Sequence, residues 1–332
     1  MDKILLGHGS GGRLMHNLIR DYFVPAFALK TLNDSAVIEN PFEGKIAITT
    51  DSYVVSPLFF PGGDIGSLSV CGTINDLSVS GAKPLYLTAG FIIEEGFPID
   101  DLKKILASMK AVSESTGVKI IAGDTKVVDR GKCDGLFINT AGFGVIEDGV
   151  DISPSNVRPG QKIILSGSIG NHGISVIAKR NGISFDPPVY SDVRPLNSLV
   201  GLMLSRTKKI RVMRDPTRGG LATTLKEIAN DSGFCIIIEE AAVKVDPGVL
   251  GACELLGLDP LYIANEGILA AVVDSEDAEM LVDAMRHSSD GAEASIIGEI
   301  KDGPQKGVLL KTISGGIRII DMLSGDQLPR IC

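Results

Sequence analysis

The sequence predicts an α+β protein built from two domains and a short C-terminal tail. Segments with helical and strand-like spacing alternate along 332 residues. This length is greater than one small hydrophobic core accommodates. Pro and Gly cluster at residues 151–160, and the alternation begins again beyond them. We therefore expect an N-terminal domain with a mixed sheet at residues 1–150 and an α/β sandwich domain at residues 151–321. Residues 322–332 show no periodicity and are expected to form a mobile tail.

The predicted N-terminal domain contains two long helices and a set of short strands. Apolar and small residues at helical spacing predict one helix over residues 65–80. The same spacing predicts a second over residues 100–116, which stops at Gly117. Runs of β-branched, aromatic and other apolar residues predict strands at residues 37–39, 46–50, 86–93, 118–122 and 137–145. The first two strands flank a segment with Pro and Gly and form a predicted hairpin.

The predicted C-terminal domain alternates strands with amphipathic helices. Leu221, Leu225 and Ile228 lie on one face of a predicted helix, and Gly233 closes it. The expected strands are residues 163–166, 235–239, 268–273 and 295–300. The expected helices are one that ends near residue 180, followed by residues 196–205, 221–232, 249–256 and 276–287.

Composition excludes several classes of function. The formal net charge is −9, and no basic patch with interleaved aromatic residues occurs, which disfavours nucleic-acid binding. No stretch has the length of a signal peptide's apolar core or of a membrane span. We expect a cytoplasmic protein that binds neither nucleic acid nor membranes.

The five cysteines do not form a disulfide or zinc pattern, because they show neither a CxxC pair nor a dense spacing. Cys71, Cys133, Cys235 and Cys253 are expected to be small, buried apolar residues. Cys332 differs because it ends the chain and is not placed as a prenylation site. Its thiol is the candidate carrier of a substrate.

A glycine-rich segment near the N-terminus fits the pattern GxGxxG at residues 7–12. A dinucleotide fingerprint needs a full strand before it, and the preceding segment is too short. We favour a loop that lies over phosphates, with a plain turn as the alternative, and expect His8 and His16 at the surface. The candidate phosphate-binding residues are Gly9, Ser10, Gly11 and Gly12.

Four aspartates of the N-terminal domain are expected near the ends of helices or strands: Asp34, Asp51, Asp76 and Asp124. Single aspartates in such places are usually turn or cap residues. Each of these has Gly, Ser, Thr or Asn beside it. As a set they suit oxygen ligation of Mg²⁺ bound to nucleotide phosphates.

Three motifs of the C-terminal domain could also contact a ligand. Residues 215–220 (DPTRGG) open a helix, so Thr217 could cap it and the glycine N–H groups could bind an anion beside Arg218. An ordinary capped helix is the alternative. Asn171 opens another helix in the segment GNHG. Glu266 precedes a buried strand, where glutamate is more often solvated than catalytic.

The order of these motifs resembles the AIR synthetase (PurM)-like superfamily of ATP-dependent enzymes. The match rests on residues 75–84 (NDLSVSGAKP), residues 123–125 (GDT) and the helix that follows Asp215. In particular, the chain resembles the HypE family of hydrogenase maturation factors at residues 8–12 (HGSGG), at the motif DPTRGG and at the terminal residues PRIC. The resemblance covers essentially the whole chain.

The resemblance implies a carbamoyl dehydratase that uses ATP and Mg²⁺ to convert S-carbamoyl Cys332 into a thiocyanate, the source of the cyanide ligand of [NiFe] hydrogenase iron. It implies a homodimer paired through the N-terminal sheets, HypF as carbamoyl donor and a HypC–HypD complex as cyanide acceptor. It makes Lys126 the candidate for orienting phosphate or substrate, and Glu266 the candidate base. The nucleotide-binding set it suggests adds Asp51, Asn75, Asp76, Asp124, Asn171, Asp215, Thr217 and Arg218 to the glycine segment.

Two alternatives stay open at this point. Another enzyme of the same fold, such as selenophosphate synthetase or a small-molecule kinase, would not explain the terminal Cys332, and the former normally has a reactive Cys or selenocysteine in the N-terminal glycine segment, where this chain has none. A scaffold that binds ATP as a switch would not consume ATP in response to a carbamoyl group on Cys332.

Overall fold

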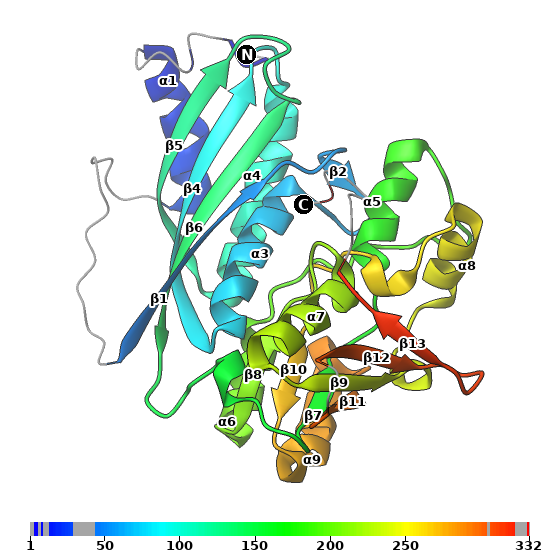
Figure 1. The fold of residues 1–332 in the computed structure, drawn as a ribbon. Helices are drawn as coiled ribbons and strands as arrows, with labels where there is room; N and C mark the ends of the chain where they lie inside the picture. Colours follow the sequence, from blue (N-terminus) through cyan, green and yellow to red (C-terminus); the bar gives the residue numbers. More distant parts are fainter. Residues whose placement is uncertain are drawn as a thin grey trace.

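The computed structural model describes residues 3–5, 8, 13–28, 44–303, 306–322 and 331, which form two domains packed against each other (Figure 1). The predicted strand at residues 37–39, and with it the hairpin, lies outside the described residues.

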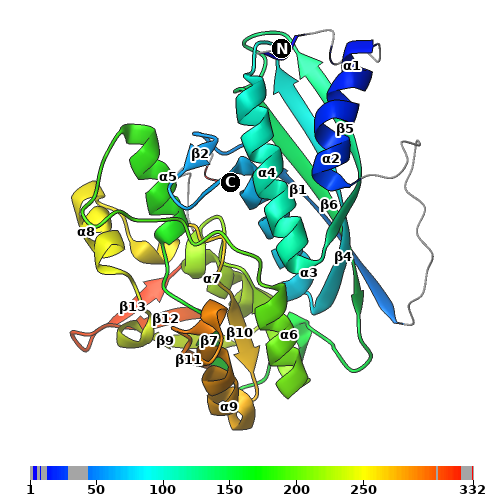
Figure 2. The ribbon, with the colours of Figure 1, turned by 180° about the vertical axis from the view of Figure 1, so that it is seen from behind.

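The N-terminal domain is built on a mixed sheet, as predicted. Its strand order is β1 (Lys45–Tyr53), β6 (Leu136–Ile146), β4 (Ala82–Glu94) and β5 (Lys119–Val128). Only β4 and β5 run parallel among these pairs. Figure 2 shows the helices α1 (Arg13–Leu18), α2 (Val24–Phe27), α3 (Ile65–Val79) and α4 (Ile99–Thr116) on one face of the sheet. A π-helical turn, Ile19–Phe23, joins α1 to α2.

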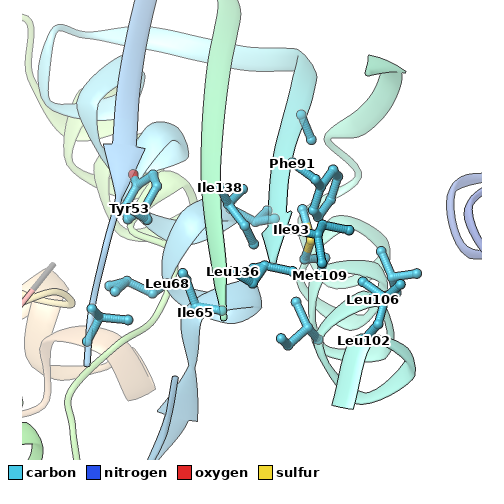
Figure 3. Packing of buried hydrophobic residues seen from close by; sticks show 14 of the residues in the cluster. Tyr53, Ile65, Leu68, Phe91, Ile93, Leu102, Leu106, Met109, Leu136 and Ile138 are labelled. Atoms are coloured by element: carbon cyan, nitrogen blue, oxygen red, sulfur yellow. The ribbon is translucent and has the colours of Figure 1, made fainter. Parts of the chain in front are cut away.

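Alternation along the strands places one set of side chains under these helices. Phe91, Ile93 and Ile138 point from β4 and β6 towards Leu106 and Met109 of α4, as Figure 3 shows. The opposite face carries no helix of the described residues, and Ile46, Ile48 and Ile92 are exposed on it. The sheet therefore has one packed face and one open apolar face.

The C-terminal domain has a sheet that is covered on both faces. Its strand order is β13 (Ile317–Ile320), β12 (Gly307–Lys311), β9 (Cys235–Glu239), β11 (Ser295–Lys301), β7 (Lys162–Leu165), β10 (Ala270–Val273) and β8 (Ile210–Arg214). Helix α7 (Gly220–Ser232) packs on one face, and α6 (Asn197–Arg206) and α9 (Ser275–Arg286) pack on the other. Short 3₁₀ turns occur at Pro154–Asn156, Glu240–Ala242, Pro260–Tyr262 and Ser289–Gly291.

Helix α5 (Asn171–Asn181) connects the two domains and packs beside α8 (Pro247–Leu256). It lies against the small sheet of β2 (Phe59–Phe60) and β3 (Gly63–Asp64) of the N-terminal domain. Ser175 Oγ donates a hydrogen bond to the carbonyl oxygen of Pro61 at 2.7 Å. Arg180 Nε donates one to the carbonyl oxygen of Ser56 at 2.8 Å.

Most predicted elements are present within a few residues of their expected ends. Strands β2, β3, β8, β12 and β13 and the helices α1 and α2 were not predicted. Cys71, Cys235 and Cys253 are buried as expected, but Cys133 is only half-buried because it lies in the turn between β5 and β6. No helix among the described residues has the length and apolar character needed to cross a membrane.

Candidate functional site

The three C-terminal motifs meet at the fully buried side chain of Asn265. Its Oδ1 accepts a hydrogen bond from the backbone N–H of Gly170 at 2.6 Å, just before α5 begins. Its Nδ2 donates to the carbonyl oxygen of Pro216 at 2.8 Å, in the segment that precedes α7. One buried amide therefore holds together the loops that open α5 and α7 and the loop that carries Glu266.

Glu266 is buried, with 2% of its surface exposed, so the expectation of a solvated side chain is wrong. It lies at the junction of the two domains, which sequence spacing does not reveal. Its Oε1 is buried without a hydrogen-bond partner among the described residues. A buried carboxyl with an unpaired oxygen is costly unless it serves a ligand or stays protonated.

The loop that carries Glu266 is fixed by the carboxylate of Asp192. Asp192 Oδ2 accepts hydrogen bonds from the backbone N–H groups of Glu266 at 3.1 Å and Gly267 at 2.9 Å. A Cβ atom at Gly267 would lie 1.8 Å from the carbonyl oxygen of Asp192, so only glycine allows this approach. The backbone of Glu266 is thus held in one position.

Other acidic side chains surround Glu266. Burial is the main cause that raises its pKa well above the ordinary value, and the charges of Asp215, Asp192, Asp51 and Asp76 raise it further. Burial, followed by the charge of Asp76, raises the pKa of Asp215 to about 7. The domain junction is therefore a site of concentrated negative charge that favours protonated carboxyls or a bound cation.

Asn75 links the domains through its side chain. Its Nδ2 donates to the carbonyl oxygens of Arg194 and Glu266, both at 3.1 Å, and its Oδ1 accepts from the N–H of Leu196 at 2.8 Å. These bonds use both of its N–H donors within the protein. Asn75 therefore positions both domains, and its direct contact with a nucleotide stays a prediction.

The aspartates are not at element ends as expected. Asp51 lies inside β1 and Asp124 inside β5, because both strands continue past their predicted stops, and Asp76 lies inside α3 before its last turn ends. Thr49 donates a hydrogen bond to Asp76 at 2.9 Å. Burial, followed by the charge of Asp51, raises the pKa of Asp76, so these two carboxylates lie near each other.

Asp124 does not join them within one chain. Strand register aligns Asp51 with Thr140, Ala89 and Gly123, so Asp124 points to the open face and Asp51 to the helix-covered face. Three strand spacings, about 14 Å, separate β1 from β5. Among the described residues no cluster of three or more acidic, His or Cys side chains could hold a metal ion, and Asp34 lies outside those residues. The predicted four-aspartate metal site is therefore not assembled by the described part of a single chain.

Lys126 lies on the same open face as Asp124. Its Nζ is 3.6 Å from Asp124 Oδ2, and 63% of the lysine side chain is exposed. Alternation along β5 directs it away from the helix-covered face, where Asp51 and Asp76 lie near Glu266. The two predicted catalytic side chains, Lys126 and Glu266, are thus not brought together within one chain.

The segment DPTRGG opens α7 differently from the prediction. The helix begins at Gly220, and Gly219 rather than Thr217 is its N-cap, with no side-chain cap from the described residues. Both glycines have positive φ, and a Cβ at Gly220 would lie 2.6 Å from the carbonyl oxygens of Leu261 and Ile263. The prediction that Thr217 caps the helix is therefore wrong. No side chain among the described residues accepts from the N–H groups at the start of α7, and Arg218 is exposed beside them.

Asn171 is the first residue of α5. Its Nδ2 donates to Asp246 Oδ2 at 2.7 Å. Its Oδ1 is buried without a hydrogen-bond partner among the described residues. Asn171 therefore retains an acceptor that a ligand could use.

Several predicted residues cannot be placed. Gly9, Ser10, Gly11, Gly12, Asp34 and Cys332 lie outside the described residues. His8 is fully buried, so the expectation of a surface histidine is wrong. Its Nδ1 accepts a hydrogen bond from the backbone N–H of Leu5 at 2.9 Å, and Lys3 of the same segment pairs with Pro98.

Ile331, the residue before Cys332, is among the described residues and packs against the N-terminal domain. Ile331 is 3% exposed and belongs to the hydrophobic core of the N-terminal domain. Its carbonyl oxygen lies 2.9 Å from Nε2 of His172 on α5. Ile331 therefore lies between the domains, against the same helix that Asn171 begins.

Sequence reasoning missed His172, Ser191 and Asp192 as site residues. For Ser191 and Asp192 the available signal was the connection between α5 and α6, residues 182–196, which is long and contains no regular element, whereas His172 lies in the segment GNHG that was singled out for Asn171. Such loops in compact domains commonly carry function.

Comparison with known proteins agrees with this architecture. Residues 32–146 match the N-terminal domain of AIR synthase related proteins, and residues 158–311 match their C-terminal domain. A thiamine monophosphate kinase from Aquifex aeolicus, 15% identical with a TM-score of 0.61 over 90% of this chain and 98% of its own, shares the fold alone.

Relatives of high identity cover the whole chain. Carbamoyl dehydratase HypE of Cupriavidus necator is 52% identical over 99% of this chain and 95% of its own length. Carbamoyl dehydratase HypE of Escherichia coli K12 is 42% identical over the full length of both. A crystal structure of hydrogenase maturation protein HypE in complex with ATP is 46% identical, with a TM-score of 0.95 over 99% of this chain and 100% of its own. The chain belongs to the carbamoyl dehydratase HypE family of AIR synthase related proteins.

Proposed function

We propose that this protein uses ATP to dehydrate a carbamoyl group carried on the Cys332 thiol, which gives a thiocyanate. The supporting observation is the position of Ile331, which is buried between the domains on the helix next to the Glu266 loop. The residue that follows is the terminal cysteine. In this proposal the thiocyanate supplies the cyanide ligand of [NiFe] hydrogenase iron.

The chemistry explains why ATP is needed. The carbonyl oxygen of an S-carbamoyl group is a poor leaving group, so the γ-phosphoryl group of ATP is transferred to that oxygen and ADP leaves. One N–H proton is lost as the C=N bond forms. The second is lost as the C–O bond breaks and phosphate departs. The products are RS–C≡N, ADP and phosphate, and the S–C bond survives.

The residues at the domain junction suit ATP and Mg²⁺. Mg²⁺ that is bound to nucleotide phosphates needs only one or two protein carboxylates, and Asp51 and Asp76 lie close enough to interact. Bound there, Mg²⁺ would neutralise phosphate charge. The exposed start of α7 and Arg218 offer N–H groups and a positive charge to phosphate. Asp215, Thr217 and Asn171 border the same loops, and Gly9, Ser10, Gly11 and Gly12 are proposed to cover the phosphates.

Glu266 is proposed to accept a proton from the substrate nitrogen. A general base works best when its pKa lies near the working pH, and burial among carboxylates raises the pKa of Glu266. Asp192 and Asn75 hold its backbone in place. The backbone of Glu266 is therefore held in one position, while burial and the charges of the nearby acids raise the pKa of its carboxyl.

Dimerisation through the open sheet face would complete the site. Ile46, Ile48 and Ile92 are exposed on that face, together with Asp124 and Lys126. Pairing two such faces buries the isoleucines and carries Lys126 towards the neighbouring subunit. We therefore assign residues 1–150 to ATP binding and dimerisation, residues 151–321 to the second half of the site at the domain junction, and residues 322–332 to the carrier tail.

The carrier role requires protein partners. HypF is proposed to load the carbamoyl group, and a crystal structure of a HypE–HypF complex is 48% identical to this chain, with a TM-score of 0.82. A HypC–HypD complex is proposed to accept the cyanide. A carrier thiol must stay reduced between cycles, which suits the cytoplasm.

Intact mass spectrometry tests this function. The protein is incubated with HypF, carbamoyl phosphate and ATP, beside a Cys332→Ala variant. A carbamoyl adduct that converts to a species lighter by one water, and that is absent from the variant, is expected. If HypF is demonstrably active and Cys332 gains no adduct, the carrier role is wrong.

A further inference from the structure

The carbonyl group of Ile331 has a specific partner between the two domains. His172 is the second residue of α5, is fully buried, and lies edge-on to the ring of Phe60 at a centroid distance of 5.3 Å. Its Nε2 is 2.9 Å from the carbonyl oxygen of Ile331. That carbonyl belongs to the peptide bond that joins Ile331 to Cys332.

The hydrogen bonds around His172 select one tautomer. A carbonyl oxygen only accepts, so Nε2 must carry the proton. Nδ1 then accepts from the Ser191 hydroxyl at 2.8 Å, and Ser191 Oγ in turn accepts from the N–H of Val193 at 3.1 Å. Burial lowers the pKa of His172 to about 4, which keeps the ring neutral at physiological pH. The ring is thereby held as a donor aimed at the end of the chain.

The same loop controls both this histidine and Glu266. Ser191 binds the His172 ring, and the next residue, Asp192, binds the backbone N–H groups of Glu266 and Gly267. Ser191 N also donates to the carbonyl oxygen of Pro61 at 2.8 Å, which fixes the loop to the N-terminal domain. The contact that holds the chain end and the contact that holds the base are thus one residue apart.

We infer that His172 is the positioning residue of the carrier arm, which with Ser191 clamps the last peptide bond so that the group on Cys332 is presented to Glu266. The inference rests on the proposed function. The clamp is a single neutral hydrogen bond together with the burial of Ile331, so it can release the arm for loading by a partner. His172 touches the carrier's backbone and takes no part in bond making.

Two readouts test the clamp: the rate at which a disulfide reagent modifies the Cys332 thiol, and the single-turnover rate of dehydration of carbamoylated protein at saturating ATP. The variants are His172→Leu, which removes the donor, and His172→Gln, whose amide N–H can reach the same carbonyl. Ser191→Ala removes the group that selects the tautomer. Ser175→Ala is the matched control, because it removes a different hydrogen bond of α5, the one to the carbonyl oxygen of Pro61, and leaves the contact between His172 and Ile331 in place.

In His172→Leu the Cys332 thiol is expected to react about tenfold faster and dehydration to slow about tenfold or more, with the ATP dissociation constant unchanged. Ser191→Ala should show the same changes to a smaller degree, His172→Gln should restore most of both values, and Ser175→Ala should match the wild type. Unchanged thiol reactivity and dehydration in His172→Leu, or equal changes in Ser175→Ala, would overturn the clamp. The thiol readout needs no carbamoyl chemistry, so failure of the wild type to dehydrate would count against the proposed function instead.

Discussion

Asn75 Nδ2 donates a hydrogen bond to the carbonyl oxygen of Glu266 at 3.1 Å, across the boundary between the two domains. Asn75 precedes Asp76 on α3, and Glu266 precedes β10. A hydrogen bond therefore joins α3, which carries the proposed magnesium ligand Asp76, directly to the backbone of the proposed base. Domain packing, rather than either domain alone, builds this site.

Replacing Asn75 tests that tie. Asn75→Ala leaves the carbonyl groups of Arg194 and Glu266 and the N–H of Leu196 without their partner, so the free energy of unfolding should fall by about 2–4 kcal/mol. Urea denaturation measures it. Asn181→Ala, which removes an exposed hydrogen bond at the end of α5, is the control and should stay within about 0.5 kcal/mol. Equal stability of the two variants would mean that the contact does not join the domains.

Glu266 should control the pH dependence of dehydration. A base must be ionised, and the pKa of Glu266 is raised, so the single-turnover rate should fall as the pH drops through that raised value. In Glu266→Gln the rate should be lower by a factor of about 10²–10⁴, and this pH limb should be lost. Rates are measured by rapid quench from pH 5 to 9. An unchanged rate in the Gln variant would remove Glu266 from the mechanism.

Asp215 should make stability depend on pH. Its pKa is raised to about 7 in the folded protein, whereas the unfolded chain titrates near the ordinary value of 3.8. The favourable effect of the protonated group is thus complete below pH 4 and is lost as the pH rises through 7. Asp215→Asn should match the wild type at pH 4 and exceed its free energy of unfolding by about 3–4 kcal/mol at pH 8. A gain that is the same at both pH values would show that ionisation of Asp215 is not its cause.

Subunit mixing tests the place where Lys126 acts. Lys126→Ala and Glu266→Gln homodimers are each expected to be inactive. If Lys126 serves the neighbouring subunit, a mixed dimer contains one intact site, so co-refolded protein should recover about a quarter of the wild-type rate. No recovery in a mixture shown by mass to contain mixed dimers would place Lys126 in its own subunit's site.

Local patterns predicted much of the fold. Helical spacing located α3 and α4, and Gly117 ended α4 in a left-handed conformation with φ of 73°, as its sequence position indicated. Strand β8 was missed because its five residues, IRVMR, form only a short run with two arginines and no regular alternation, between two polar segments.

Sequence motifs identified residues of the site, but they did not show how these residues are arranged in space. Gly123 looked like the end of a strand, but β5 runs to Val128, and this continuation turns Asp124 away from Asp51. Burial of Glu266 depends on α3 of the other domain, 191 residues away in the chain from Asn75 to Glu266. The docking of Ile331 onto His172 spans 159 residues and leaves no local pattern.

The most direct test follows the oxygen atom of the carbamoyl group. Cys332 is carbamoylated with ¹⁸O-labelled cyanate, with Cys332→Ala protein as the control, and one turnover is started with ATP. The account predicts that the released phosphate carries the label, because the carbonyl oxygen leaves bonded to phosphorus, and that the protein is left as a thiocyanate. Unlabelled phosphate released while the thiocyanate forms would contradict phosphoryl activation of that oxygen.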